Sequence, residues 1–495
     1  MMPVSRFLNR LSRDPRHDTL LASPAFQFTL VILLALSFYF SKLGGHGLAT
    51  WDDCYYAEKA KEILQTGDWL TMRYNREPIF DNPPFYMWLA ALSFKIFGVT
   101  DYAAKFPSAL MGVLTVALTF VLGRRWFDAW TGFLAAFVLA TTPTFNKYAR
   151  HAMLDVTLTF FVTLALFSFV LALEKDRRYF LLWGTAIAIS VLIKSVLGLF
   201  PLFISLAYLL LCKNFKTFVS PYFCSGIVIA FALGGFWYLH QWLLFGEDFL
   251  RVHFGWLILQ RGFQMQPEPW YAHLSYLKDL LIYYWPWLPL LLLGSFYMLK
   301  NAKAREPIPL LLMLWLAGYL FILSVMQARR LWYLMPIFPA AAIVAAHALH
   351  RILSPRAKLI FAQAVLALLV VSNIAVNATP LQIESEREKD IRMLAPYVRH
   401  FGNAGARVLG FRKDYHSLNN ALLFYSDHAA APIMQSSEEL RTAMQAAHTV
   451  LCVMELSSWQ ALQNEMPGIF VIKQTEKLVL IANRALDASA VKTWR

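Results

Sequence analysis

The stretch Met153–Leu173, which reads MLDVTLTFFVTLALFSFVLAL, decides the fold of this chain. It carries one charged residue, Asp155, and it is long enough to cross the hydrocarbon core of a bilayer as a helix. Over the whole chain of 495 residues, 58% are hydrophobic and only 15% are charged. This composition predicts a polytopic α-helical membrane protein and excludes an ordinary soluble enzyme.

Apolar stretches of this kind recur along the chain and predict about eleven transmembrane helices. They lie near 26–43, 103–123, 129–145, 153–173, 179–193, 196–211, 220–245, 280–299, 307–326, 331–350 and 358–378. Lys and Arg gather in alternate loops and at the N-terminus, which the positive-inside rule places in the cytoplasm. The net charge of +14 is therefore assigned to these loops and not to a nucleic-acid partner. The N-terminal span is expected to be an uncleaved anchor in the inner membrane.

The opposite, periplasmic face then receives a long loop, 44–102, and the C-terminal region. In the loop, the helical spacing after Tyr55 and the aromatic segment after Pro84 predict two amphipathic juxtamembrane helices on the membrane surface. From about Thr379 the composition becomes more charged, which predicts a transmembrane domain over 1–378 and a small α/β domain over 379–495. The C-terminal domain carries no catalytic motif, so packing or substrate recognition is its expected role. No obligatory disulfide is expected among the four cysteines.

Two adjacent acids open the outer loop, in the segment Trp51-Asp52-Asp53-Cys54-Tyr55-Tyr56-Ala57-Glu58. Carboxylates at a membrane boundary are costly to desolvate, and neighbouring like charges raise each other's pKa. The pair is therefore a candidate for acid/base or metal chemistry. An ordinary helix N-cap, which Asp also favours, explains the pair equally well.

Further polar residues fall on the same predicted face of the membrane. Asp155 begins an apolar helix, and Arg150 lies about one turn before it, where it could pair with Asp155 or bind an anion. A charge favoured by the helix dipole is the alternative for Asp155. Asp81-Asn82-Pro83-Pro84 is a stiff turn that could hold a polar side chain or simply start a helix.

Cations are also expected on this outer face, against the positive-inside trend. They are Lys194, Arg251, His253, Arg261, Arg329 and Arg330. Lys and Arg are phosphate-binding side chains, although any one of these could be a solvated loop charge. The chain has no nucleotide-binding loop motif, which argues against direct use of ATP or a nucleotide sugar. Acids and cations on the outside of an apolar body together indicate a lipid-borne phosphate substrate and a polar acceptor.

A set of these motifs resembles the membrane glycosyltransferases of the C-type fold. The similarity is greatest to the bacterial branch that includes the aminoarabinose transferase acting on lipid A and the protein O-mannosyltransferase relatives. It covers roughly the first 350 residues. The matching motifs are Asp52-Asp53, Tyr56-Ala57-Glu58, Gly67-Asp68-Trp69-Leu70, Asp81-Asn82-Pro83-Pro84, Tyr86, Trp88-Leu89, Phe97-Gly98, 104–109, 150–159, Lys194, Tyr284-Trp285-Pro286-Trp287 and 330–336.

The resemblance implies transfer of a sugar from a polyprenyl-phosphate carrier to a lipid or protein acceptor at the outer face of the inner membrane. Asp52 matches the first acid of the family's Asp-Glu motif, Asp53 replaces its Glu, and Asp155 matches the acid of the second outer loop. Tyr55 stands where the aminoarabinose branch usually has Arg, and Asn82 where a Lys commonly precedes the prolines. These two departures separate the chain from the aminoarabinose enzyme itself, but they do not change the reaction class that the resemblance implies.

The expected catalytic residues are Asp52, as base or orienting group for the acceptor, and Asp155. The expected substrate-binding residues are Asp53, Tyr56, Glu58, Asp81, Asn82, Arg150, Lys194, Arg261, Arg329, Arg330 and Tyr333. No cofactor is required, although Asp52, Asp53 and Asp155 could hold a divalent metal ion. A flippase or transporter of an anionic lipid is the alternative, and it predicts charged groups deep inside the spans. A third reading is a structural subunit whose outer domain binds a partner.

Overall fold

The computed structural model describes residues 20–49, 52–263, 269–303, 307–378, 389–411, 415–427, 433–489 and 491. Contacts divide the chain into two compact units. We call the first the helical unit; it comprises residues up to Ser41, Phe80–Tyr86 and Pro107–Leu381. The second, the mixed unit, comprises Lys42–Ile79, Met87–Phe106 and Gln382–Arg495. A domain boundary at 378 remains a prediction from composition.

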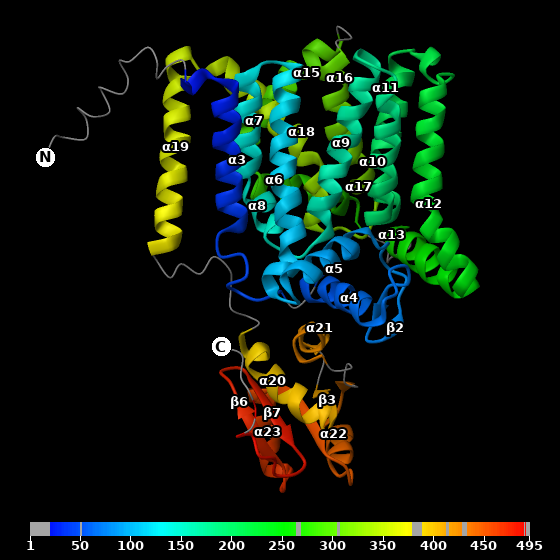
Figure 1. The fold of residues 1–495 in the computed structure, drawn as a ribbon, viewed down its shortest axis with the longest axis vertical. Helices are drawn as coiled ribbons and strands as arrows, with labels where there is room; N and C mark the ends of the chain where they lie inside the picture. The colour runs from blue at the N-terminus through cyan, green and yellow to red at the C-terminus, as the bar shows by residue number, and fades with distance from the viewer. Residues whose placement is uncertain are drawn as a thin grey trace, which may run out of the picture. The chain divides into compact units, whose positions relative to one another are not determined.

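The helical unit is built from helices that lie side by side (Figure 1). Its α-helices are α3 (Pro24–Phe40), α6 (Asp101–Trp126, from Pro107 on), α7 (Ala129–Thr141), α8 (Pro143–Ala149), α9 (Leu154–Glu174), α10 (Tyr179–Lys194), α11 (Phe200–Leu211), α12 (Pro221–Leu250), α13 (Arg261–Phe263), α14 (Ser275–Tyr283), α15 (Leu288–Lys303), α16 (Pro307–Met313), α17 (Tyr319–Val325), α18 (Phe338–Ile352) and α19 (Pro355–Ala378). Shorter 3₁₀ or π turns are η1 (Ser195–Leu199), η2 (Phe215–Thr217), η3 (Arg251–Gln260), η4 (Trp270–Leu274), η5 (Leu314–Gly318) and η6 (Leu331–Ile337).

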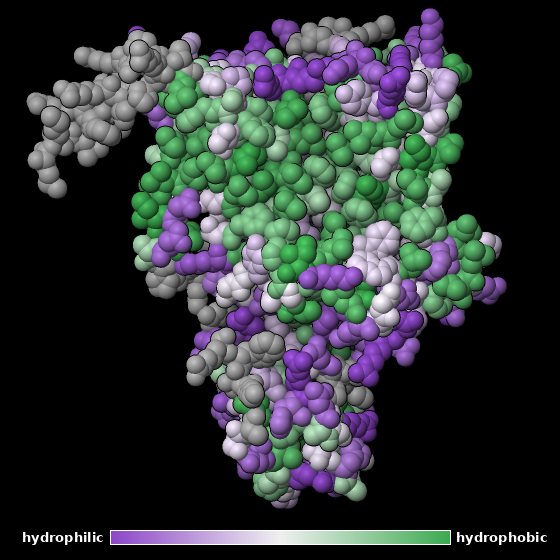
Figure 2. All heavy atoms as spheres, in the orientation of Figure 1, coloured by the Kyte–Doolittle hydropathy of each residue, from purple (hydrophilic) through white to green (hydrophobic). Residues whose placement is uncertain are grey.

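Among the described residues, seven helices are long and apolar enough to cross a membrane, or eight if the bent pair Tyr271–Tyr283 and Leu288–Lys300 forms one span. The chain is therefore a multi-span membrane protein, and each predicted span coincides with one helix or with two or three consecutive helical segments. Figure 2 shows hydrophobic residues over the middle of these helices and hydrophilic residues at their ends. The count of eleven crossings remains a prediction, since several of these helices are short.

The stretch 179–211 forms two antiparallel helices instead of one long one. The Trp183 indole Nε1–H donates to the Ser205 hydroxyl at 3.1 Å, which brings residues on either side of η1 together. Ser195 adopts a positive φ of 40° at the reversal, a conformation that L-residues other than Gly rarely take. The predicted division between 193 and 196 therefore falls at the observed turn.

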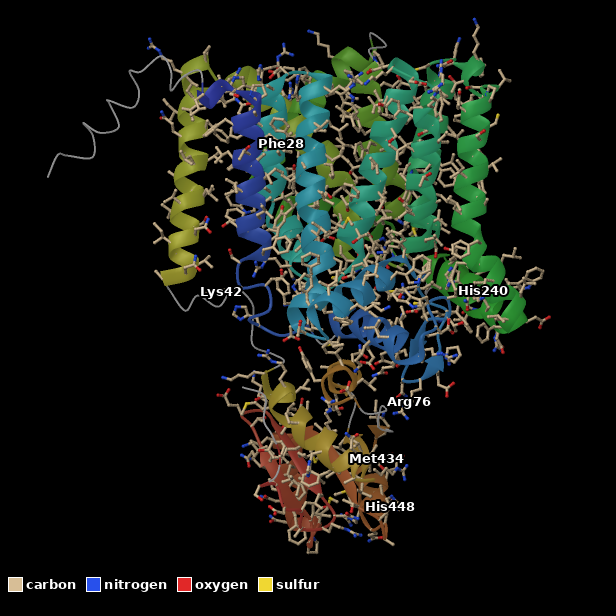
Figure 3. The ribbon with its side chains drawn as sticks, in the orientation of Figure 1. Phe28, Lys42, Arg76, His240, Met434 and His448 are labelled. Atoms are coloured by element: carbon tan, nitrogen blue, oxygen red, sulfur yellow. The ribbon has the colours of Figure 1, made fainter. Side chains whose placement is uncertain are left out.

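The basic loops share one end of the helical unit. Arg125, near the end of α6, pairs with Glu174 at the end of α9 at 3.0 Å, so these two helices finish at the same side. Phe28 of α3, which is labelled in Figure 3, packs edge-to-face on Phe120 of α6, with ring centroids 5.2 Å apart. Asp155 lies in the first turn of α9, at the end opposite to Glu174. The structure thus separates the cationic loops from Asp155 along the helix axis.

Helices α10 and α12 approach so closely that glycine is required at their contact. A Cβ atom at Gly226 would lie 2.4 Å from the Phe180 carbonyl oxygen, closer than any real Cβ contact. We expect Gly226→Ala to lower the unfolding temperature by several degrees, since overpacking a well-packed site costs about 1–3 kcal/mol. Thermal unfolding of the detergent-purified protein measures the effect.

Gly235 of the same helix supplies the control for this prediction. A Cβ there would meet no atom within 4 Å, and alanine is the better helix former. Gly235→Ala should therefore leave the unfolding temperature unchanged or raise it. Equal losses for the two variants would contradict the close contact between α10 and α12.

The mixed unit contains a five-stranded sheet of order β4-β3-β5-β7-β6. Its elements are α4 (Asp52–Thr66), β1 (Arg73–Tyr74), β2 (Glu77–Pro78), α5 (Phe85–Phe97, from Met87 on), α20 (Lys389–Asn403), β3 (Arg407–Phe411), α21 (Tyr415–Ser426), β4 (Ile433–Met434), α22 (Ser437–Met444), β5 (Val450–Glu455), α23 (Leu456–Leu462), η7 (Gln463–Glu465), β6 (Phe470–Gln474) and β7 (Leu478–Ala482). Strands β4, β3 and β5 are parallel, whereas β7 is antiparallel to both β5 and β6.

The core of this sheet follows the two-residue period of its strands. Leu409, Cys452 and Ile481 point to one face, where they pack with Leu440 of α22 and Trp459 of α23. The predicted small C-terminal α/β region is confirmed. The sequence did not predict β7, β4, α21 or α23.

Candidate functional site

The candidate site in the helical unit centres on Asp155, Lys194 and Tyr333. The Lys194 ammonium, at the last residue of α10, donates to Oδ1 of Asp155 in the first turn of α9. The same ammonium lies 3.9 Å from the centroid of the Tyr333 ring in η6, a cation–π contact. The Asp155 side chain is 1% exposed and that of Lys194 14% exposed. The structure thus brings together three of the predicted site residues.

Asp155 keeps one oxygen available. Its Oδ2 atom is buried and has no hydrogen-bond partner among the described residues. A buried carboxylate oxygen without a partner is destabilising unless a ligand or water satisfies it. This atom is therefore the strongest local indication of a ligand-binding site.

The segment just before Asp155 is held by hydrogen bonds between side chains and the backbone. The Ser108 hydroxyl donates to the Met153 carbonyl at 2.8 Å and accepts from the Met153 N–H at 3.2 Å. Arg150 donates through Nη1 to the carbonyls of Phe38, at 2.8 Å, and Ser41, at 2.9 Å, where α3 ends. A guanidinium at a helix C-terminus satisfies carbonyls that have no partner in the helix. Arg150 therefore has a structural role, and its predicted part in substrate binding remains a prediction.

A second polar group adjoins Lys194. His253 of η3 is fully buried, and its Nδ1 lies 2.6 Å from the Phe80 carbonyl oxygen. Because a carbonyl only accepts, Nδ1–H is the donor, and Nε2 then accepts from the Ser195 hydroxyl at 3.0 Å. His253 connects the turn that carries Asp81 and Asn82 to the end of α10. The sequence suggested only an outer loop charge at His253, because a buried contact 173 residues away leaves no local signal.

The remaining predicted cations of this unit lie at other contacts. The Arg261 guanidinium lies 5.9 Å from the Trp256 ring centroid, and Arg329 lies 3.0 Å from Nδ1 of His273. Arg330 is exposed, and its backbone N–H donates to the Tyr276 hydroxyl at 3.2 Å. Their side chains stay candidates for phosphate binding by position and charge.

The two adjacent acids of the mixed unit, Asp52 and Asp53, differ in their burial. Asp53 is 1% exposed, and its Oδ2 accepts from the Ala49 N–H at 3.3 Å, so it fixes the start of α4. Asp52 is half-buried and precedes it in the same helical turn. The structural role suggested for the pair therefore applies to Asp53, and Asp52 is the better candidate for chemistry. Tyr56 is buried in the same helix.

The charged stripe of α4 is buried, although the sequence suggested a helix lying on the membrane surface. Lys61 is 3% exposed; its ammonium pairs with Glu58 at 2.6 Å and donates to the carbonyls of Leu423 and Phe424 in α21. Burial raises the pKa of Glu58 to about 7, even though Lys61 opposes this shift. Periodicity identified the helix, but a partner more than 300 residues away covers its polar face.

This pKa makes stability depend on pH. A carboxyl group whose folded pKa exceeds its unfolded value stabilises the fold below the unfolded pKa and loses that contribution as pH rises through the folded pKa. Between about pH 4.5 and 7, Glu58 should therefore destabilise the protein as pH rises, by an amount on the order of 3 kcal/mol. We expect Glu58→Gln to flatten the decline in unfolding temperature between pH 5 and 8. Glu476→Gln, at an exposed acid, should keep the wild-type slope.

Metal ligands are not grouped in the described residues: no three His, Cys, Asp or Glu side chains gather there. Asp52 and Asp53 belong to the mixed unit and Asp155 to the helical unit, so a metal ion held by these three acids stays a prediction. A divalent ion supported by fewer protein ligands stays an open part of the prediction.

The amino-acid sequence is similar to one protein family and to several known proteins. Residues 81–237 match the family model described as dolichyl-phosphate-mannose-protein mannosyltransferase. An uncharacterized protein of Aquifex aeolicus is 32% identical over 324 residues, covering 65% of this chain and 63% of that protein. The undecaprenyl phosphate-alpha-4-amino-4-deoxy-L-arabinose arabinosyl transferase 2 of Pseudomonas fluorescens is 27% identical over 73% of this chain and 65% of its own length. The chain thus spans somewhat less than two thirds of these relatives.

Solved structures show the same fold. ArnT from Cupriavidus metallidurans, bound to undecaprenyl phosphate, has a TM-score of 0.76 at 19% identity and covers 93% of this chain and 98% of its own. The oligosaccharyltransferase AglB from Archaeoglobus fulgidus, in complex with a peptide and a dolichol-phosphate, has a TM-score of 0.56 at 13% identity and covers 89% and 70%. The predicted resemblance to membrane glycosyltransferases of this fold is confirmed.

Proposed function

We propose that this protein transfers a sugar from a polyprenyl-phosphate carrier to an envelope acceptor, a lipid or a protein, at the periplasmic face of the inner membrane. The observation that carries the proposal is the buried Asp155–Lys194 pair, with an oxygen of Asp155 left for a ligand. The relatives named above, which act on undecaprenyl-phosphate-linked sugar or bind polyprenyl phosphates, support the donor class.

In the proposed reaction, an acceptor oxygen attacks the anomeric carbon as the bond from that carbon to the phosphate oxygen breaks. The carrier leaves as polyprenyl phosphate with one more negative charge than the bound donor. Contacts with Asp155 and the Tyr333 ring hold the Lys194 ammonium in place. The ammonium can therefore stabilise the negative charge of the leaving phosphate without first changing its position. Arg261, Arg330 and Arg329 would add positive charge around the same phosphate.

The two acids take different parts. Asp52 accepts the proton if the acceptor is a hydroxyl, and only positions the acceptor if it is an anionic phosphate. Asp155 orients Lys194 through one oxygen and binds a sugar hydroxyl through the other. Asp81 and Asn82 would contact the sugar from their rigid turn. This division requires Asp52 and Asp155 to face one substrate, which is part of the proposal.

A transporter is less consistent with where the charges lie. Asp155 is in the first turn of α9 and Lys194 is the last residue of α10, whereas a transporter predicts its charged site near the middle of the spans. The inferred orientation has the N-terminus and the Arg125 end cytoplasmic, because Lys and Arg gather there.

Reconstitution in vesicles separates the two activities. The purified protein would be mixed with a membrane extract that contains lipid-linked sugars and acceptors, and the products would be analysed by mass spectrometry. A transferase forms free polyprenyl phosphate and a glycosylated acceptor in equal amounts. A transporter leaves every lipid-linked sugar intact and changes only its leaflet.

A further inference from the structure

A cavity at the basic end of the helical unit lies apart from the residues assigned to the reaction. It has a volume of about 870 Å³ and lies between the start of α3, the ends of α6 and α9, and the start of α10. This volume is within the range of small-molecule sites, roughly 300–1,000 Å³. Asp155 lies at the opposite end of α9, so the cavity is separate from the candidate site.

The wall of this cavity carries positive charge. Arg124 and Arg125 of α6 line it together with Lys175, the residue that follows α9, and none of the described residues in the wall is an acid. Arg125 is already paired with Glu174 at 3.0 Å. Arg124 and Lys175 are exposed and form no ion pair within the part of the chain that the structure describes.

The ion pair between α6 and α9 brings these two cations close to each other. Arg124 precedes Arg125 in the chain and Lys175 follows Glu174, and consecutive Cα atoms are only about 3.8 Å apart. Two cations from different helices therefore lie beside one cavity with their charges unused. Arg and Lys are the side chains that bind phosphate oxygens.

The rest of the wall is largely apolar. Phe120 is buried, Phe28 and Phe167 are half-buried, and Val121 is 39% exposed. Tyr179 adds a ring of the kind that prefers the headgroup depth of a bilayer. Cations at a membrane boundary next to an apolar wall match a molecule that has a phosphate at one end and hydrocarbon at the other.

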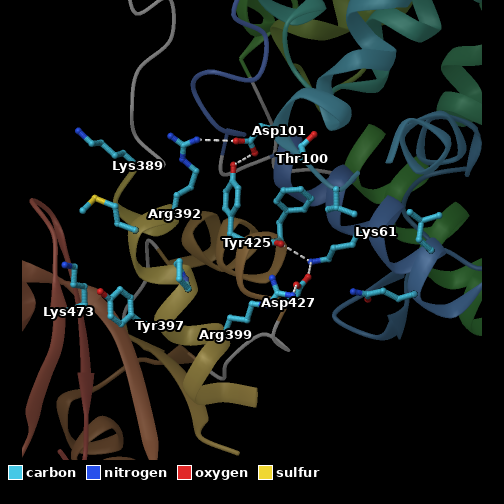
Figure 4. A pocket seen from close by; sticks show the side chains of 16 residues that line it. Lys61, Thr100, Asp101, Lys389, Arg392, Tyr397, Arg399, Tyr425, Asp427 and Lys473 are labelled. Atoms are coloured by element: carbon cyan, nitrogen blue, oxygen red, sulfur yellow. Dashed lines mark hydrogen bonds and ion pairs between the residues drawn. The ribbon is translucent and has the colours of Figure 1, made fainter. Parts of the chain in front are cut away.

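The cavity of the mixed unit differs in how its charges are used. It has a volume of about 920 Å³, and the acids in its wall hold cations of the same wall (Figure 4). Arg392 pairs with Asp101 at 3.2 Å, and Asp427 pairs with Lys61 at 3.0 Å and with Arg399 at 3.0 Å. An acid-free wall with two unpaired cations makes the cavity of the helical unit the better anion site.

We propose that the cavity of the helical unit binds an anionic phospholipid from the leaflet that adjoins the basic loops. The lipid phosphate lies between Arg124 and Lys175, and an acyl chain lies along Phe28, Phe120 and Val121. Basic pockets between membrane-spanning helices bind anionic lipid headgroups in this way. The lipid joins α3 to the ends of α6 and α9 and takes no part in sugar transfer, so the proposal is independent of the proposed function.

Lipid binding to the purified full-length protein, delipidated in detergent, tests the proposal. Native mass spectrometry would compare phosphatidylglycerol with phosphatidylcholine of the same acyl chains, and with glycerol 1-phosphate, which has the phosphate but no acyl chain. We expect phosphatidylglycerol to bind at least about tenfold more tightly than phosphatidylcholine. Equal binding of the two lipids, or equal binding of phosphatidylglycerol and glycerol 1-phosphate, would overturn the anionic phospholipid site.

Charge variants locate the phosphate. Arg124→Gln and Lys175→Gln should each weaken phosphatidylglycerol binding by about fivefold and leave phosphatidylcholine binding unchanged. Lys216→Gln is the matched control, because Lys216 is exposed in η2 and does not line the cavity. It lies at the same end of the helices, since Arg177 donates to the Thr217 hydroxyl at 3.2 Å. Equal weakening by Lys175→Gln and Lys216→Gln would reduce the effect to net charge and contradict the proposal.

A variant that fills the cavity separates its volume from its charge. Ala25 is exposed and lines the cavity, so Ala25→Trp occupies part of the space while all three cations stay in place. We expect this variant to weaken phosphatidylglycerol binding as strongly as Lys175→Gln does and to keep the wild-type unfolding temperature. Wild-type lipid binding by Ala25→Trp would place the lipid outside the cavity and overturn the site.

Discussion

Asp155→Asn is expected to lower sugar transfer by at least about two orders of magnitude. The substitution removes the carboxylate that positions the Lys194 ammonium, and it takes away the oxygen that would bind the sugar. Loss of a pre-positioned charge that stabilises a leaving group costs about 10²–10³ in rate. Transfer would be measured in membranes as glycosylated acceptor formed per amount of protein.

Two further variants make this result interpretable. Glu174→Gln changes an acid to its amide at the other end of the same helix, and it should retain wild-type transfer. Breaking a buried ion pair also destabilises a protein, by about 3–5 kcal/mol. The double variant Asp155→Asn with Lys194→Met removes both charges, so it should recover part of the stability and none of the activity. Wild-type transfer by Asp155→Asn would remove Asp155 from the reaction.

Asp52→Asn is expected to have the second large effect, a loss of about 10²–10⁴ in transfer rate if the acceptor is a hydroxyl. Asp52 is half-buried at the first turn of α4, and its replacement by an amide removes a proton acceptor while keeping the side-chain shape. The unfolding temperature should change little. Rates in membranes and thermal unfolding of the purified protein measure the two effects separately.

Asp53→Asn serves as the comparison, because it changes the neighbouring acid. Asp53 is buried and accepts the Ala49 N–H, so its variant should unfold at a lower temperature and keep a larger share of the activity. The reverse pattern, a stability loss at Asp52 and an activity loss at Asp53, would exchange the roles assigned to the two acids.

The apolar helices of the helical unit were predictable because each follows from local composition. A run such as 153–173 cannot remain in water, and in a bilayer it must satisfy its backbone as a helix, so its position needs no tertiary information. Gly67 ends α4, with a φ of +72° and its N–H bonded to the Ile63 carbonyl at 2.9 Å, a helix end that glycine typically provides. The strand β7 was not predicted, although its five residues form a continuous buried apolar run like that of β5.

The site was predictable in its residue types but not in its pairings. Charged residues at the ends of apolar spans identified Asp155 and Lys194, since such charges are expensive at a membrane boundary. The pairing of Asp155 with Lys194, 39 residues away, and of Arg150 with the end of α3 depends on how the helices pack. Lys61 and His253 are likewise buried by elements that are distant in the sequence, so the local pattern of residues could not predict their burial.

The most direct test of the central claim compares the cell envelope with and without this protein. Lipids and proteins of the envelope would be analysed by mass spectrometry in wild-type cells, in a deletion strain, and in that strain expressing the wild-type chain. We predict that one class of acceptor loses the mass of a single sugar on deletion and regains it with the wild-type chain. Acceptors of identical mass in all three strains, with lipid-linked sugar redistributed between the leaflets, would contradict a transferase and establish a transporter.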